Sequence, residues 1–170
     1  MSLKEKLDAR KQALELRNAK IAAELKEHTD NLVTPLLEEV IATLSIQKGK
    51  ISQQIYGIQE TDYVREDRKP FYIASLKWNE RTEPGYGKTI ECIYVIVFPN
   101  ITGGFEFRVK GGGQRYLGER NYAYTRDPDF KDHLEDVVAK TLMLQHFHQT
   151  PKNYSDFVWA LQSAGYPARP

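Results

Sequence analysis

Apolar positions at the start of the chain recur at the spacing of an α-helix. Residues 2–28 are rich in Ala, Leu, Glu, Lys and Arg, which favour helices. At about 100° per residue, one narrow apolar stripe runs along this helix. Its members are Leu3, Leu7, Leu14, Ile21 and Leu25. So narrow a stripe suits contact with one other helix, and we predict an arm that forms a coiled coil or docks on a partner through these residues.

A second helix is predicted to begin at Thr34, with Pro35 at its first helical position, where the missing N–H does no harm. Its wider apolar face consists of Leu36, Leu37, Val40, Ile41 and Leu44. A similar spacing continues through Gly49 to about residue 55. Because residues 29–33 separate the two helices, the pattern predicts an antiparallel helical hairpin.

The spacing then changes to that of β-strands. Residues 71–79 predict one strand, and residues 89–98 are so continuously apolar and β-branched that they predict a central strand buried on both faces. Apolar and charged residues alternate over 105–110, and a further strand is predicted over 114–125. The short connections favour a four-stranded antiparallel meander.

Two helices are predicted after the strands, over residues 128–146 and 155–164. The apolar face of the first would cover one face of the sheet. We therefore predict an α+β protein, in which residues 1–57 form the helical hairpin or arm and residues 58–170 form a body of antiparallel sheet and C-terminal helices.

Composition narrows the functional classes. The chain has 170 residues, a net charge of +1 and 41% hydrophobic residues, which suits one domain or one domain with an appendage. It is too neutral to coat nucleic acid or anionic lipid with its whole surface. The charged N-terminus does not resemble a signal peptide, and the longest apolar run, residues 92–98, is too short to span a bilayer. We expect a cytoplasmic protein without a membrane partner.

A local cluster of cations and aromatic rings gives an alternative function. Over residues 104–126 the predicted hairpin carries Arg108, Lys110, Arg115, Tyr116, Arg120, Tyr122 and Arg126. Aromatic platforms flanked by cations bind single-stranded nucleic acid, often on a sheet face. Alternating aromatic residues also arise wherever a sheet packs on helices. A nucleic-acid-binding module is therefore the alternative to an interaction protein.

The sequence contains no recognisable catalytic, metal or cofactor motif. The glycines at 111–113 lack the Gly-Lys-Ser/Thr ending of a phosphate-binding loop and suit a hairpin turn. His146 and His148 would point about 200° apart on a helix, so they could not share a metal there. Cys92 is the only cysteine, and its apolar surroundings predict a buried thiol.

Together these patterns predict a non-catalytic adaptor or assembly protein that binds a protein partner or forms a homo-oligomer, without cofactor or metal. A further alternative is a small enzyme or ligand-binding domain whose pocket lies between the sheet and the C-terminal helices.

Overall fold

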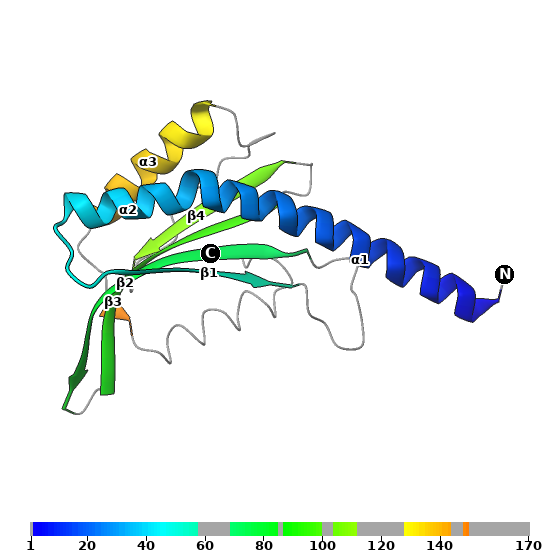
Figure 1. Ribbon diagram of the computed structural model, residues 1–170, viewed down its shortest axis with the longest axis horizontal. Coiled ribbons are helices and arrows are strands. Elements are labelled where there is room, and N and C mark those ends of the chain that lie inside the picture. The colour runs from blue at the N-terminus through cyan, green and yellow to red at the C-terminus, as the bar shows by residue number, and fades with distance from the viewer. Residues whose placement is uncertain are drawn as a thin grey trace.

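The computed structural model describes residues 2–57, 69–84, 87–99, 104–111, 128–143 and 148–149. Three helical segments come first: α1 (Leu3–His28), η1 (Thr29–Val33) and α2 (Thr34–Thr43). Four strands, one helix and a short strand follow: β1 (Lys50–Tyr56), β2 (Phe71–Glu83), β3 (Gly87–Pro99), β4 (Phe105–Gly111), α3 (Pro128–Met143) and β5 (His148–Gln149). Figure 1 shows the long N-terminal helix lying along the sheet, with α3 beside it. The predicted α+β class is confirmed.

The first three segments form one uninterrupted helix (Figure 1). Thr29 and Thr34, at the two ends of η1, both keep right-handed helical dihedral angles. Within η1 the helix is π-helical, and the N–H of Thr34 donates to the carbonyl of Thr29. The helical hairpin expected from the sequence therefore does not form, because residues 29–33 continue the helix instead of reversing it.

Two residues account for the wide π-helical turn. Thr29 is fully buried, and its hydroxyl donates to the carbonyl of Leu25 at 2.8 Å, a bond that tends to bend helices. Pro35 has no N–H, and its ring would clash with the carbonyl four residues earlier in a regular α-helix. The sequence signal for a break near Pro35 is thus real, but the helix accommodates it with a wider turn.

A Schellman motif ends α2 after Thr43. The N–H of Ile46 donates to the carbonyl of Ile41 at 3.0 Å, and the N–H of Ser45 donates to Ala42 at 3.3 Å. Ser45 occupies the left-handed position of the motif, with φ of 53°. The last carbonyl groups of the helix are thereby satisfied, and the chain leaves the helix direction.

The predicted continuation of this helix to about residue 55 is wrong, because the chain passes through Gly49 into strand β1. A Cβ on Gly49 would lie only 3.2 Å from the side chain of Ile41, so a larger residue would be crowded there. Ile51 and Ile55 remain partly buried against the core, but from one face of a strand.

The sheet is antiparallel, in the order β1-β2-β3-β4, with β5 paired to the first part of β3. Ala74 of β2 and Val109 of β4 both pair with Val95 of β3, so β3 is central. The predicted four-stranded antiparallel sheet is confirmed, but β1 supplies one of its strands. The strand predicted over 114–125 and the helix predicted over 155–164 lie outside the described residues.

The helices and one face of the sheet enclose the larger hydrophobic core. Its strand residues alternate along β2, β3 and β4, and its helical residues come from α1, η1, α2 and α3. They include Leu25, Val33, Leu37, Tyr72, Leu76, Ile93, Val95, Phe107, Val109, Phe130 and Leu134. The helices of residues 3–43 thus share one core with the sheet, while the division of the chain at residue 57 stays a prediction.

The opposite face of the sheet is also buried. Its cluster consists of Tyr56, Phe71, Ile73, Cys92, Tyr94, Ile96 and Phe98. β3 is buried from Cys92 to Pro99, which confirms the predicted central strand with two buried faces. Within the described residues, no helix is both long enough and apolar enough to cross a membrane.

Replacing Ser45 by glycine is expected to raise the free energy of unfolding by about 1 kcal/mol. An L side chain at positive φ costs about 1–2 kcal/mol, a cost that glycine largely avoids. Thermal denaturation measures the change. Ser45→Ala keeps a Cβ and should not stabilise the chain, so a Ser45→Gly variant no more stable than Ser45→Ala would contradict the assigned motif.

Candidate interaction surface

The first part of α1 extends beyond the sheet as an exposed helical arm (Figure 1). Every residue from Ser2 to Ala13 is exposed, and we define residues 2–13 as the arm. A capping box fixes its first turn: Glu5 N–H donates to Ser2 Oγ at 3.2 Å, and Ser2 N–H donates to Glu5 Oε2 at 2.9 Å. At 1.5 Å per residue the arm is about 18 Å long.

The second part of α1 packs on the sheet. Asn18, Ala22 and Leu25 are buried, and Ile21 packs against the larger core. The Asn18 side-chain oxygen accepts two hydrogen bonds from the neighbouring Arg17 guanidinium, at 3.0 and 3.1 Å. The side-chain oxygen of the buried Asn18 is therefore hydrogen-bonded, as buried polar groups usually are.

The five predicted partner-binding residues occupy three environments. Leu3 and Leu7 are 74% and 59% exposed, Leu14 is partly buried, Leu25 is fully buried in the core of this chain, and Ile21 packs against that core. The structure thus brings them onto one stripe but does not leave them on one free surface. Their role in binding a partner stays a prediction, and within the arm it falls on Leu3 and Leu7.

Polar side chains tie β1 to the π-helical turn. Gln53 donates from Nε2 to Asp30 Oδ1 and to Thr34 Oγ1, both at 2.8 Å. Lys26 pairs with Asp30 Oδ2 at 3.0 Å. The hydrogen bonds from Gln53 and Lys26 lower the pKa of the Asp30 carboxyl, because they stabilise its charged form. This cluster holds the end of α1 against the edge of the sheet.

His28 lies beside the same turn. Its ring meets Phe105 edge-on, with 4.4 Å between the ring centroids. The Nε2 atom of His28 is buried without a hydrogen-bond partner in the described part of the chain. Burial lowers the pKa of His28 from 6.5 to about 4, because the charged imidazolium would lose its hydration. His28 is therefore neutral at physiological pH.

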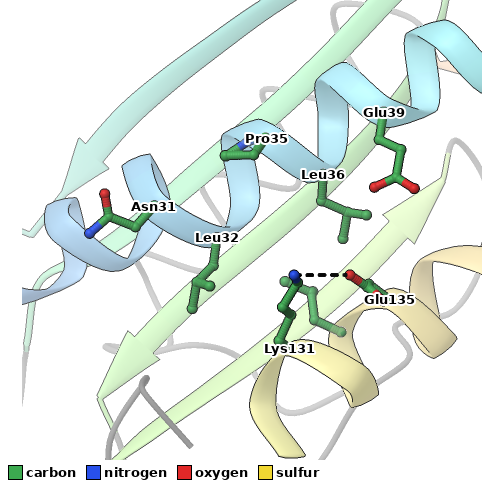
Figure 2. Close-up of a pocket in the computed structure, with 8 residues that line it drawn as sticks. Asn31, Leu32, Pro35, Leu36, Glu39, Lys131 and Glu135 are labelled. Atoms are coloured by element: carbon green, nitrogen blue, oxygen red, sulfur yellow. Dashed lines mark ion pairs between the residues drawn. The ribbon is translucent and has the colours of Figure 1, made fainter. Parts of the chain in front are cut away.

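A groove runs between the N-terminal helix and α3 (Figure 2). It has a volume of about 130 Å³ and opens to solvent. Its apolar lining comes from Leu32, Pro35 and Leu36 on one helix and Leu134 on the other. The polar residues at its edge are Asn31, Glu39, Lys131 and Glu135. Leu36 belongs to a helix face that the sequence predicts, and Leu134 lies in the helix predicted over residues 128–146. The groove itself arises only where the two helices meet.

Acidic side chains dominate the two helices that form the groove. α2 carries two glutamates and no basic residue, and α3 carries four carboxylates against two lysines. At the groove itself, Lys131 Nζ lies 3.9 Å from Glu135 Oε1, with both side chains well exposed. An ion pair this long and exposed contributes little, because water screens it and both side chains stay mobile. The groove is apolar inside, and its rim carries two carboxylates against one lysine, on helices that are acidic as a whole.

The alternative nucleic-acid surface is described only in part. Arg108 is 4% exposed and lies 5.5 Å from the centroid of the Phe98 ring. Lys110 is partly buried, and desolvation lowers its pKa. Arg115, Tyr116, Arg120, Tyr122 and Arg126 lie outside the described residues. Of the two cations that are described, Arg108 is buried in the sheet layer and Lys110 is partly exposed, and the role of this surface in binding nucleic acid stays a prediction.

The described residues contain no group of three or more His, Cys, Asp or Glu side chains that could hold a metal ion. Cys92 is buried, as its apolar surroundings predict. The side chains of His146 and His148 lie outside the described residues, so their inability to share a metal stays a prediction.

No protein-family model, curated protein or solved structure matches this chain.

Truncating one leucine on each side of α1 should show which side packs on the sheet. Leu25→Ala should lower the free energy of unfolding by about 2–5 kcal/mol, because it leaves a cavity in the core. Leu16 is 75% exposed on the opposite side of the helix, and Leu16→Ala should change that free energy by less than about 0.5 kcal/mol. Urea denaturation measures both values; equal values would contradict the packing of α1 on the sheet.

Stability is expected to fall as the pH drops from about 6.5 towards 4. In this window the unfolded chain binds a proton at His28 that the folded chain does not, so the unfolded state gains stability. Asp30 acts at lower pH, since its own pKa is lowered from 3.8. A His28→Leu variant should lose part of the slope of stability against pH in this window. An unchanged slope would show that His28 is not the titrating group.

Proposed function

We propose that this chain is a non-catalytic interaction protein of the assembly or adaptor type, which associates with a second copy of itself through the arm. The observation that carries the proposal is that the apolar stripe of α1 continues past the sheet. In its C-terminal part Leu25 is buried in the core and Ile21 packs against it, whereas Leu3 and Leu7 lie on the same side of the helix with most of their surface in water.

The position of the two leucines supports a binding role over a purely solvated one. Single exposed leucines are common on protein surfaces, but these two lie one turn apart and in phase with buried residues further along the helix. Burying one leucine contributes about 1.5–3 kcal/mol. Two leucines from each of two copies therefore offset a substantial part of the cost of association, and we expect a dissociation constant of about 100 μM or below.

The helical state of the arm gives a second line of support. An isolated helix of about 12 residues is marginal in water. The arm nevertheless combines a capping box with a run of strong helix formers. A helix that is stabilised locally at a site without core contacts is typical of a segment that presents a helix face to another protein.

Substitution of the exposed leucines tests the proposal. The full chain is expected to self-associate at about 100 μM, as measured by sedimentation velocity. Leu3→Asp/Leu7→Asp should shift it to the monomer while leaving its thermal denaturation unchanged, because neither side chain contacts the core.

Leu16→Asp is the matched control, because Leu16 is equally exposed but lies on the opposite side of α1. It should associate like the unaltered chain. A monomeric unaltered chain, or a Leu3→Asp/Leu7→Asp variant that still associates, would contradict the proposal.

A further inference from the structure

We infer that the arm of one copy binds in the groove between α2 and α3 of another copy, with its leucines against the apolar lining and its cations at the acidic rim. This inference rests on the proposed self-association and names the surface that receives the arm. Three features of the described residues support it: the reach of the helix, the shape of the groove and the distribution of charge.

The arm cannot reach the groove of its own chain. Leu7 and Leu32 lie on the same uninterrupted helix, so more than about 30 Å separates them along the axis. No turn between them allows the helix to fold back. An arm that occupies this groove must therefore come from a second copy.

The groove suits a leucine side chain. Its lining combines Leu32, Leu36 and Leu134, and its volume is about 130 Å³, on the scale of cavities that hold one small apolar group. Figure 2 shows the leucine side chains of the N-terminal helix directed towards α3, with Glu39 and Glu135 at the edge. The site is thus an apolar floor whose edge carries two carboxylates, Glu39 and Glu135, against the single amine of Lys131.

The arm has the opposite polarity around its leucines. At 100° per residue, Glu5 and Asp8 lie about 120–180° away from the stripe of Leu3 and Leu7. The basic residues lie within about 80° of it. They are Lys4 and Lys11 on one side of the stripe and Lys6 and Arg10 on the other. An apolar stripe flanked by cations matches an apolar groove flanked by carboxylates.

The same charges disfavour the simplest alternative, a coiled coil of two arms. Pairing two arms along their leucines would bring the flanking cations of both helices together at the positions that normally hold salt bridges. Like charges at such positions destabilise the pair. The acidic groove offers the arm both an apolar contact and opposite charge, so the groove is favoured as its binding site.

Reversing the charge on each surface tests the contact in the full chain. The arm-reversed variant is Lys4→Glu/Lys6→Glu, and the groove-reversed variant is Glu39→Lys/Glu135→Lys. In either variant alone, the arm and the groove rim carry charges of the same sign, so the association constant should fall at least about tenfold. In an equal mixture, the reversed arm of one variant meets the reversed groove of the other, and the unaltered arm of the second meets the unaltered groove of the first. Opposite charges then face each other in both pairs, and association should be restored. Thermal denaturation of each variant verifies that the fold is intact.

The outcomes separate this inference from the proposed function. If the groove-reversed variant associates as well as the unaltered chain while Leu3→Asp/Leu7→Asp is monomeric, self-association through the arm stands and the groove is excluded. Loss of association in both charge variants without recovery in the mixture also overturns the inference. If the unaltered chain is monomeric at about 100 μM, both proposals fail.

Recovery in the mixture should weaken as salt rises, because exposed charges more than about 10 Å apart are screened at 0.1 M salt and closer pairs are screened at higher salt. A recovery that does not depend on salt would contradict the role of the rim charges.

Discussion

The packing of one long helix on one face of the sheet is the interaction on which the other features depend. Leu25, Val33 and Leu37 are fully buried and come from α1, η1 and α2 in turn, so the helix is held over about 18 Å of its length. This attachment fixes the point at which α1 leaves the sheet and becomes the arm. It also fixes α2 beside α3, and the groove exists only because both helices lie on that face.

The sequence predicted helices and strands correctly where the spacing of hydrophobic residues fits only one of the two. The apolar run of β3, the alternation in β4 and the apolar face of α3 all predicted the observed element. The interpretation failed at Ile51 and Ile55, because residues four apart share a face in a helix and in a strand alike. The hairpin failed for a different reason: Pro35 marks a disturbance, but spacing does not reveal whether a helix ends there or widens into a π-helical turn.

The candidate surface was predictable only in part. The stripe that contains Leu3 and Leu25 is evident from the sequence, yet nothing in the spacing shows where the sheet beneath it ends, so buried and exposed members look alike. The groove depends on contact between helices that lie far apart in the chain, and local patterns carry no such information. Likewise the alternation around Arg108 marks it as outward-facing, whereas in this sheet both faces are buried.

The continuity of α1 has a thermodynamic consequence for the arm. Helix formation is cooperative: starting a helix is unfavourable, whereas extending one is easy. The part of α1 that packs on the sheet already supplies the nucleus, so residues 2–13 need only propagate it outwards to the cap at Ser2. The same residues as a free peptide would have to nucleate alone. Attached to the domain, the arm is already ordered, so the proposed contact would lose little binding energy to the conformational entropy of the arm.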